Sequence, residues 1–454
     1  MKSGAVSVVG LGKLGACMAA CMASKGIRVV GVDINEETVT AMRHGRAPTY
    51  EPGLAELLAT VKPANLMVTT DIAAITETDT TFIVVPTPSE PNGAFSLRYV
   101  KEAAQGIGRA LRDKKGYHVV AVTSTGLPGA TEYGILPILE RASGKKLGDF
   151  GLCYNPEFIA LGTVIHDFLS PDFVLIGESD QFAGAQVAKI YEQVCEIQPD
   201  VPQWHPRRKP PVAHMSIPSA ELAKVAINSY LVTKIAIANM LGDFCEELPG
   251  ADVADVTHVL GLDSRIGPKF LKAAMPASGP CLPRDSVALA YFGKVLGVNA
   301  VLPMATDAAN SARIERLAKQ VIAVTPAGGT VAILGLAYKP GTNVLDGAPG
   351  YLLARRLSAR QPVQKIKAVR VFDPVAKWPW GGTTSSSVEE CIRDAHVIVV
   401  ANPDPAFVDL GDCAGKIVID PWRIVTNHIG ADYRPFGIGA TDEAAEARLK
   451  KMWA

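Results

Sequence analysis

Three glycines near the start of the chain have the spacing of a phosphate-binding loop. Gly10, Gly12 and Gly15 follow a short apolar run and precede a helix-like stretch. Glycine allows the tight turn and the close approach of the backbone to a pyrophosphate, whose charge a helix N-terminus favours. Asp33 ends the next apolar run, where a carboxylate can bind the ribose 2′-hydroxyl of NAD and would repel the 2′-phosphate of NADP. The pattern predicts NAD binding, and a glycine turn in an unrelated α/β fold is the alternative.

A second set of residues could perform covalent chemistry. Cys281 lies in the run Gly279-Pro-Cys-Leu-Pro-Arg-Asp285, and a thiolate can attack an aldehyde and hold it as an adduct. Lys224 and Asn228 are four residues apart, so on a helix they share a face and can stabilise charge on a reacting oxygen. Taken alone, each feature has a plainer interpretation, because a lone cysteine is most often a small buried apolar residue and the helix face could simply be solvated.

The composition of the 454-residue chain favours two or three globular domains. Its 45 basic and 45 acidic residues cancel, which argues against a general attraction to nucleic acid or to an anionic membrane. The eight cysteines include no CxxC pair, so we expect no disulfide framework, no metal site and a reducing, cytoplasmic setting. Lys13 interrupts the apolar N-terminus, which we interpret as a strand and a helix rather than a signal peptide. We find no apolar run of about 18 residues and expect no transmembrane helix.

The elements that must position these residues alternate along the first part of the chain. Short apolar or β-branched runs are separated by helix-like stretches such as Glu36–Arg43 and Leu97–Leu111, which is the rhythm of a mostly parallel, doubly wound sheet. The expected strands are Ala5–Val9, Arg28–Val32, Met67–Thr69, Thr81–Val85, His118–Thr123 and Phe173–Ile176.

The pattern then changes. Gln198–Pro211 is rich in proline and basic residues, which predicts a loop that is either solvated or faces a substrate. Ser219–Glu247 has no proline, no glycine before Gly242, and apolar residues at helical spacing, so we expect one long helix with further helices to about Val324.

A second α/β region begins at Thr330, with a glycine-bounded loop, a helix at Tyr351–Leu357 and further strands. Its expected strands are Val331–Leu334, Ala368–Phe372, Val397–Ala401 and Ile417–Ile419. The predicted fold class is therefore α/β, with two Rossmann-like doubly wound parallel-sheet domains joined by a long central helix and a small helical domain. The expected domain boundaries are 1–205, 206–320 and 321–454.

Several motifs follow one another in a fixed order. They are Pro48-Thr-Tyr-Glu-Pro-Gly-Leu54, Val85-Pro-Thr-Pro88, Ser124-Thr125, Asn155-Pro-Glu-Phe158, Ala220-Glu-Leu-Ala-Lys224 with Asn228, Arg265-Ile-Gly267, Cys281-Leu-Pro-Arg-Asp285 and Gly335-Leu-Ala-Tyr-Lys-Pro-Gly-Thr342. In this order they resemble the UDP-glucose/GDP-mannose dehydrogenase family, and the resemblance extends to about Arg423. It implies an NAD-binding first domain, a central domain that forms a dimer, and a third domain that binds the nucleotide sugar.

The resemblance also implies a reaction, the NAD-dependent oxidation of a sugar alcohol to an acid in two steps. Cys281 would hold the intermediate, first as a thiohemiacetal and then as a thioester that water cleaves. Lys224 and Asn228 would stabilise the alkoxide of the first step, and Asp285 would lie near the attacking water. Glu157 would assist thioester hydrolysis, and Thr125 would hold a water by the nicotinamide.

The same resemblance supplies binding residues. Those for NAD are Gly10, Leu11, Gly12, Lys13, Leu14, Gly15, Asp33, Val85, Pro86, Thr87, Ser124 and Thr125. Those for the sugar and its diphosphate are Glu157, Phe158, Lys224, Asn228, Arg265, Phe270, Leu271, Lys272, Gly279, Tyr338, Lys339 and Arg423. Arg265 resembles an arginine that reaches into the neighbouring subunit, which implies a homo-oligomer of at least two chains. The late arginine motif is shifted by one residue at Arg423.

The chain departs from the family pattern in four places. Leu161 stands where a second glutamate is frequent, and Pro276-Ala-Ser-Gly-Pro280 replaces a glycine- and aromatic-rich approach to the cysteine. Asp346 stands where an arginine usually meets the cofactor, and Asn402-Pro-Asp404 replaces a Thr-Glu-Trp run. An acidic residue at position 346 removes an attraction to pyrophosphate, so we hypothesise that cofactor affinity or sugar choice differs.

The substrate expected from the resemblance is UDP-glucose, which would become UDP-glucuronate. GDP-mannose is the nearer alternative, and a UDP-N-acetyl amino sugar is a more distant one. Two other classes share parts of the pattern, namely a single-step hydroxyacid or 6-phosphogluconate-type dehydrogenase and a nucleotide-sugar binder without catalysis. The number of NADH formed per sugar separates them, because it is two, one or none.

Overall fold

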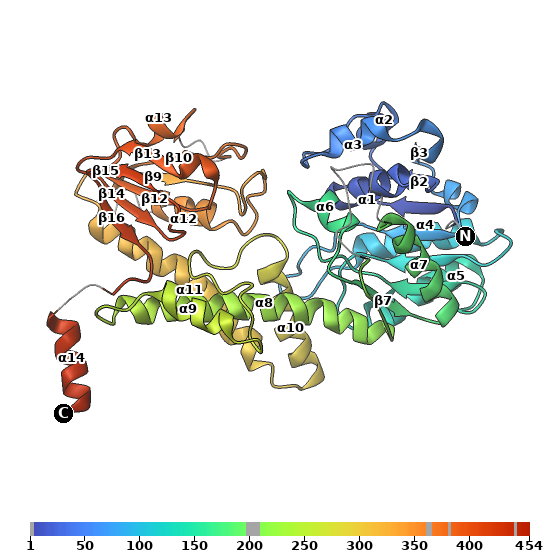
Figure 1. Ribbon diagram of the computed structural model, residues 1–454. Helices are drawn as coiled ribbons and strands as arrows, with labels where there is room; N and C mark the ends of the chain where they lie inside the picture. Colours follow the sequence, from blue (N-terminus) through green and yellow to red (C-terminus); the bar gives the residue numbers. More distant parts are fainter. Residues whose placement is uncertain (1–3, 197–208, 360–365, 380–382, 440–442) are drawn as a thin grey trace. The chain divides into compact units, whose positions relative to one another are not determined.

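The computed structural model describes residues 4–196, 209–359, 366–379, 383–439 and 443–454 (Figure 1). By its internal contacts the chain forms two compact units, Met1–Ala226 and Ile227–Ala454. Most of the predicted Gln198–Pro211 loop lies outside the described residues. The helical region and the second α/β region, which we expected as separate domains, fall in the same compact unit, and the division into three domains at 205 and 320 stays a prediction.

The first unit is built on one eight-stranded sheet with the order β3-β2-β1-β4-β5-β6-β7-β8. Neighbouring strands are parallel except for β6 and β7, which run antiparallel. The strand order reverses direction between β1 and β4, and such a switch point opens a crevice at the carboxyl edge of the strands. The strands are β1 Val6–Val9, β2 Val29–Val32, β3 Leu66–Thr69, β4 Thr80–Ile83, β5 Val119–Val122, β6 Gly151–Tyr154, β7 Val174–Glu178 and β8 Val212–Met215.

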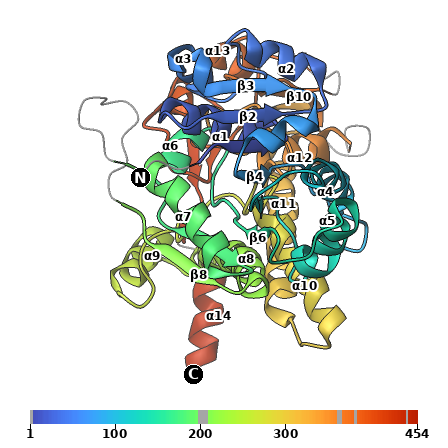
Figure 2. The same cartoon turned by 90° about the vertical axis from the view of Figure 1, so that its right-hand side faces the viewer.

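Helices cover both faces of this sheet, because its strands are apolar on both sides. In β1, Val8 packs with the helices of one face and Val9 with those of the other. One face carries α1 Lys13–Ser24, α3 Leu54–Thr60, α6 Val164–Leu169 and α7 Gln181–Val194. The other face carries α4 Arg98–Leu111 and α5 Leu136–Ser143, which lie side by side (Figure 2). The short helix α2 Glu36–Arg43 follows β2.

Helix α8, Ile217–Glu246, has 30 residues and belongs to the first unit up to Ala226 and to the second from Ile227. Among the helices that the structure describes, it alone is long and apolar enough to cross a membrane by length and composition, with a mean hydropathy of 1.3 over its best window. Its apolar residues are interrupted by polar ones, so it is not the uninterrupted apolar run that was sought, and the prediction of no transmembrane helix stays a prediction. The central helix of a globular protein meets the same criterion, and α8 buries Glu221, Lys224 and Asn228 against protein partners.

The second unit combines helices with a six-stranded parallel sheet of order β11-β10-β9-β12-β14-β16. Its strands are β9 Gly329–Leu334, β10 Ile366–Phe372, β11 Thr383–Thr384, β12 Val397–Val400, β14 Ile417–Asp420 and β16 Asp432–Pro435, with β13 Asp409–Asp412 and β15 Asn427–Ile429 as a separate pair. Its other helices are α9 Val253–Leu262, α10 Leu282–Leu296, α11 Val301–Val324, α12 Pro349–Ser358, α13 Val388–Ile392 and α14 Glu443–Trp453.

The predicted fold class is confirmed. Every strand expected from the sequence is present within about three residues of its expected ends, and the helix expected at Ser219–Glu247 is α8. Six strands were not expected, namely β6 and β8 of the first unit and β11, β13, β15 and β16 of the second. The antiparallel step between β6 and β7 was not expected either, because strand direction depends on the tertiary connection and leaves no local pattern.

Candidate active site

The glycine loop lies at the switch point of the first sheet. Gly10 follows β1 with a φ of 96°, and a Cβ atom there would lie 2.4 Å from the carbonyl oxygen of Val84. Gly15 has the same limitation, since its Cβ would lie 1.9 Å from the oxygen of Gly10. Gly12 is different, because nothing lies within 4 Å of its Cβ position and it caps α1 without a side-chain hydrogen bond. The helix start therefore has free space beside Gly12, and a pyrophosphate could approach the backbone there.

Asp33 is half-buried beside this loop. Its Oδ2 accepts the backbone N–H of Leu11 at 2.6 Å, and its Oδ1 accepts that of Asn35 at 2.8 Å. The carboxylate therefore fixes the loop to the end of β2 and remains partly accessible. Of the other loop residues, Leu11 is buried and Leu14 packs against the core, so they can contribute only backbone groups or packing.

The segments that follow β4 and β5 are tied together by Ser124. Its hydroxyl donates to the carbonyl oxygen of Val85 at 2.7 Å and accepts the N–H of Val85 at 3.0 Å. Thr87 is buried, Pro86 is exposed and Thr125 is half-buried. Val85 and Ser124 thus join residues 85–87 and 124–125, which follow β4 and β5 on the far side of the switch point from Gly12.

Glu157 follows β6, and its carboxyl contacts the hydroxyl of Tyr191. Burial raises the pKa of Glu157 to about 7, although the Tyr191 hydrogen bond and the charge of Lys224 act in the opposite direction. Lys224 Nζ donates to the carbonyl oxygen of Glu157 at 2.6 Å and lies 4.4 Å from the centre of the Phe158 ring. A carboxyl that titrates near neutral pH can accept or donate a proton, as general acid–base work requires.

In the second unit, Cys281 is exposed and immediately precedes α10. All eight cysteines lie in described residues and none forms a disulfide. Asp285, one turn into α10, is fully buried and accepts a hydrogen bond from Asn228 Nδ2 at 2.6 Å. Arg284 Nε lies 3.4 Å from the other oxygen of the same carboxylate. The structure therefore joins an amide of α8 to a carboxylate one turn beyond the thiol, a pairing that was not predicted.

The segment before Cys281 packs against the loop that follows β9. Gly279 has a φ of 85°, and a Cβ atom there would lie 2.7 Å from the ring of Tyr338. Its N–H faces the carbonyl oxygen of Gly347 at 3.4 Å. Lys339 is half-buried and Asp346 is exposed in the same loop. The predicted substrate residues Gly279, Tyr338 and Lys339 are thus brought together.

Four other predicted binding residues lie elsewhere in the second unit. Lys272 is exposed, with its Nζ 5.8 Å from the centre of the Trp422 ring, and Leu271 is buried. Phe270 is exposed with a φ of 65°, a conformation that costs energy in a residue with a side chain. Arg265 projects outward, with 86% of its side chain exposed, and pairs with Asp263.

Arg423 is engaged within its own unit. Its NH1 pairs with Asp252 at 2.7 Å, and its Nε donates to the carbonyl oxygen of Phe436 at 3.0 Å. These bonds engage all three nitrogens of the guanidinium, since NH2 also donates to Phe436, and they indicate a structural role for Arg423. A role in binding substrate stays a prediction, as it does for Arg265.

The structure thus divides the predicted catalytic residues into two groups. Thr125, Glu157 and Lys224 belong to the first unit, and the other three are Asn228, Cys281 and Asp285 of the second. The sequence did not reveal Tyr191, which lies in an ordinary amphipathic helix far along the chain from Glu157. It also did not reveal Glu221, which is buried and accepts the N–H groups of Gly129 and Thr131 just beyond Thr125.

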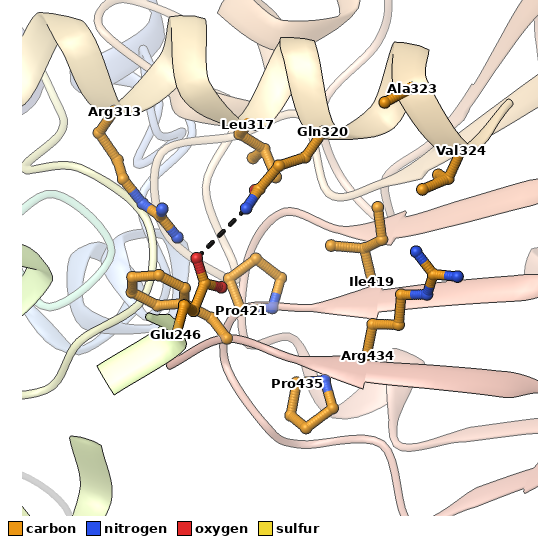
Figure 3. A pocket seen from close by; sticks show the side chains of 11 residues that line it. Glu246, Arg313, Leu317, Gln320, Ala323, Val324, Ile419, Pro421, Arg434 and Pro435 are labelled. Carbon is orange, nitrogen blue, oxygen red and sulfur yellow. Dashed lines mark hydrogen bonds between the residues drawn. The ribbon is translucent and has the colours of Figure 1, made fainter. Parts of the chain in front are cut away.

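One cavity of the second unit, about 240 Å³ in volume, is lined by none of these residues (Figure 3). It is bounded by Glu246, Arg313, Leu317, Gln320, Ala323, Val324, Ile419, Pro421, Arg434, Pro435 and Phe436. Its polar groups are paired with one another or with their neighbours, since Gln320 donates to Glu246 at 3.3 Å, Arg313 pairs with Asp243 at 3.2 Å and Arg434 with Asp432 at 2.6 Å. Among the described residues, no cluster of three or more His, Cys, Asp or Glu side chains is arranged to hold a metal ion.

A glycine-rich helix start at the switch point of a parallel sheet, with an acidic residue at the end of the second strand, is the pattern of a dinucleotide-binding domain. Three models of the UDP-glucose/GDP-mannose dehydrogenase family match this chain. They are the NAD binding domain at residues 4–195, the central domain at 218–312 and the UDP binding domain at 332–427. The chain belongs to this family, and it is a nucleotide-sugar 6-dehydrogenase that uses NAD.

Curated relatives of two kinds match nearly the whole chain. The UDP-glucose 6-dehydrogenase AglM of Haloferax volcanii is 37% identical over 440 residues, which cover 94% of this chain and 99% of that protein. The GDP-mannose 6-dehydrogenase of Azotobacter vinelandii is 33% identical over 438 residues, with 91% and 95% covered. A solved structure of a UDP-glucose dehydrogenase from Pyrobaculum islandicum has a TM-score of 0.85 and 33% identity, with 95% of this chain and 97% of that chain covered.

Proposed function

We propose that the chain oxidises the C6 alcohol of UDP-glucose twice and releases UDP-glucuronate. The observation that carries the proposal is the exposed thiol of Cys281 at the start of α10, one turn from the buried Asn228–Asp285 pair. The choice of UDP-glucose is supported by the AglM relative and by the Pyrobaculum islandicum structure, both of which carry that substrate in their names.

In the first oxidation the sugar hydroxyl loses its proton while C6 becomes an aldehyde. Lys224 and Asn228 are one helical turn apart on α8, so both side chains project to the same side of that helix. Their ammonium and amide N–H groups stabilise the developing alkoxide. The Asn228 amide can do this only with the N–H that is not bound to Asp285, so the hydrogen bond to Asp285 fixes the direction of the other.

Before the second oxidation Cys281 adds to the aldehyde: its sulfur bonds to the carbon, the C=O double bond becomes a single bond, and the proton that left the thiol ends on the oxygen as a hydroxyl. Loss of a hydride from C6, which carries two electrons and one proton, together with loss of the hydroxyl proton, converts this thiohemiacetal into a thioester on Cys281. Water then attacks the thioester carbon, one proton of the water passes to Glu157, and the C–S bond breaks to return the thiol and release the acid. The pKa of Glu157, raised to about 7 by burial, suits a group that must take up and give back that proton.

NAD fits the loop of Gly10, Gly12 and Gly15, where the free space beside Gly12 would take the pyrophosphate and Asp33 the ribose. When it is bound, NAD supplies the electron acceptor for each oxidation. The edge made by residues 85–87 and 124–125 would border the nicotinamide. The diphosphate of the sugar nucleotide would be held by Lys339 and Lys272, whose ammonium groups attract phosphate.

GDP-mannose is the second candidate substrate, since the Azotobacter vinelandii relative matches almost as closely. A panel of UDP- and GDP-sugars, with NADH counted per sugar consumed, separates the two. We expect two NADH per UDP-glucose and at least tenfold lower kcat/KM for GDP-mannose, on the scale of one lost binding interaction. One NADH per sugar would indicate a single-step dehydrogenase, and none with any sugar would contradict the proposal.

The thiol itself is tested by Cys281→Ser. We expect this variant to lose on the order of a thousandfold or more in kcat, because serine cannot form the thioester. The matched control is Cys413→Ser, because the Cys413 thiol already donates to the carbonyl oxygen of Leu410 at 3.7 Å and a hydroxyl can take its place. A Cys281→Ser enzyme that still forms two NADH per sugar would exclude the thioester route.

We also propose that the enzyme works as a homo-oligomer of at least two chains in the cytoplasm. The support is the exposed guanidinium of Arg265 and the eight thiols without a disulfide. Light scattering of the pure protein would give the oligomer size. If Arg265→Ala restores activity when mixed with an inactive Cys281→Ser chain, Arg265 acts across the interface, whereas no restoration would contradict that role.

A further inference from the structure

Three polar side chains of the first unit, those of Asn155, Glu157 and Tyr191, contact one another in the interior of that unit. Tyr191, in the last turn of α7, is almost completely buried, and its hydroxyl contacts both Glu157 Oε1 and Asn155 Oδ1, the latter at 2.8 Å. Asn155 is itself 1% exposed and comes directly after β6. Glu157 therefore shares its buried hydrogen-bond partner with an amide two residues earlier in the chain.

The orientation of the Asn155 amide is fixed by its other end. Its Nδ2 donates to the backbone carbonyl of Leu175 at 2.9 Å, and a carbonyl can only accept. Oδ1 is therefore the atom that faces Tyr191, and it needs a donor. Because a tyrosine hydroxyl carries one proton, Tyr191 cannot donate to Asn155 and to an ionised Glu157 at the same time.

Two arrangements satisfy this count. If Glu157 is protonated, it donates to the Tyr191 oxygen, and Tyr191 donates to Asn155. If Glu157 is ionised, Tyr191 donates to the carboxylate, and the Asn155 oxygen has no bond from Tyr191. We propose that Tyr191 is a positioning residue that turns its hydroxyl between Glu157 and Asn155 as Glu157 gains and loses a proton. This inference rests on the proposed function for its catalytic meaning.

The charges around Glu157 agree with such an exchange. Burial raises its pKa to about 7, while Lys224 from α8 and Tyr191 from α7 act in the opposite direction. The remaining titratable groups that face it are the thiols of Cys195, beyond α7, and Cys21, of α1, and burial raises the pKa of both. Burial and the neighbouring Glu157 also raise the pKa of Tyr191, so the hydroxyl keeps its proton.

The exchange gives the O–H of protonated Glu157 a defined hydrogen-bond acceptor, the oxygen of Tyr191. When Glu157 is protonated, its O–H donates to the Tyr191 oxygen and the Tyr191 O–H donates to Asn155 Oδ1. The Tyr191 and Asn155 oxygens then each accept a hydrogen bond. Loss of the proton reverses the bond between Glu157 and Tyr191 and breaks the bond from Tyr191 to Asn155. Tyr191 thus stabilises both forms of Glu157 and keeps the two close in energy, which a base that must release its proton in each cycle requires.

The test titrates Glu157 directly by infrared difference spectroscopy of its carboxyl band, which Glu157→Gln identifies by removing it. In the wild type we expect a midpoint near pH 7. In Tyr191→Phe the ionised form loses a charged hydrogen bond, so the midpoint should rise by about one to two pH units. In Asn155→Leu, which has a similar volume, the protonated form loses the end of its chain, so the midpoint should fall by about half to one unit.

The matched control is Tyr117→Phe, which removes a hydroxyl that donates to Asp180 at 2.9 Å elsewhere in the first unit. It should leave the midpoint where it is. Opposite shifts in the two test variants support the exchange, because a merely structural loss would not change sign between them. An unchanged midpoint in either variant, or shifts in the same direction, would overturn it; if Tyr191→Phe fails to fold, Asn155→Leu decides alone.

The titration needs no substrate, so its result does not depend on the proposed reaction. If no sugar nucleotide is oxidised but the two midpoints still move apart, the proposed function fails and the exchange stands. If sugars are oxidised, the acid limb of kcat against pH should move with the midpoint of each variant. An acid limb that stays in place in all of them would remove the link between the exchange and catalysis.

Discussion

The two parallel sheets begin in the same way and then diverge. Gly10 after β1 and Gly335 after β9 both have a φ of 96°, and Gly15 and Gly350 both press against the carbonyl oxygen of that first glycine, with Cβ positions only 1.9 and 2.0 Å from it. An aspartate at the end of the next strand accepts the backbone N–H that follows the first glycine in each case.

The difference lies in what separates strand from helix. In the first sheet α1 begins at Lys13, and the space above Gly12 is open. In the second, α12 begins only at Pro349, and residues 336–348 form a long loop that packs against Gly279. The same backbone arrangement is therefore followed by two different structures. In the first sheet it leads to a helix start with space for a pyrophosphate, and in the second to a loop that contacts the segment before Cys281.

The largest effect is expected where Gly15 and Gly350 approach the carbonyl oxygen of the first glycine in each loop. Gly15→Ala and Gly350→Ala each place a methyl group within 2.0 Å of a backbone oxygen. Because that oxygen cannot move without displacing the strand, we expect each variant to lose more than about 4 kcal/mol of stability or not to fold. Calorimetry of each variant is the measurement. Gly12→Ala, which has open space and a φ of −69°, is the control and should melt like the wild type.

The second-largest effect is expected for stability, to which Asp373 should contribute more than Asp33. Asp373 accepts four backbone N–H groups, from Leu336, Ala337, Val375 and Ala376. Asp33 accepts two. We expect Asp373→Ala to cost about 2–4 kcal/mol in the free energy of unfolding, because it leaves buried donors without partners. Asp33→Ala should cost about half as much but weaken NAD binding about tenfold. Denaturant unfolding and NAD titration measure both, and equal costs would contradict the comparison.

Gly12→Val sharpens the assignment of the open helix start. The side chain would occupy the space left for the pyrophosphate, so NAD binding should weaken by about 10- to 100-fold while UDP binding and the melting temperature stay unchanged. Isothermal titration with each nucleotide separates the two effects. If NAD binds with its wild-type affinity, the pyrophosphate does not lie above Gly12.

The smallest effect is expected at Asp346, in the long loop of the second sheet. Replacing this exposed acidic residue with arginine should raise NAD affinity by roughly three- to tenfold if the loop reaches the pyrophosphate, because a surface charge contributes up to about 1 kcal/mol. Asp346→Asn removes only the repulsion and should give a smaller gain. Equal affinities in all three proteins would show that this loop does not influence NAD binding.

The parts that the sequence predicted well depend on local pattern. The strands of both sheets are short apolar runs between helices, and the glycines of the first loop are separated from Asp33 by one strand and one helix. The sequence did not predict strand β6, because Gly151–Tyr154 is short and begins with glycine. The order of strands in the sheet follows from connections rather than from any one run of residues.

The parts that were missed depend on contacts between distant segments. Asn228 and Asp285 could each be singled out, but their hydrogen bond joins α8 to α10 across 57 residues. Tyr191 has an apolar ring at a helix position that faces the core, so its pattern is that of packing, and only its hydroxyl distances identify it. The protonation of Glu157 likewise depends on burial, which a sequence does not report.

The reversal of direction at β7 has a consequence for Glu157. Because β7 runs antiparallel to β6, it ends at the opposite edge of the sheet from Glu157, and α7 must start there and return. The last turn of α7, which holds Tyr191, therefore ends close to Glu157. The carboxyl end of a helix carries a partial negative charge from its aligned peptide dipoles. One inverted strand thus places the carboxyl end of a helix near Glu157, where its partial negative charge opposes ionisation of the carboxyl.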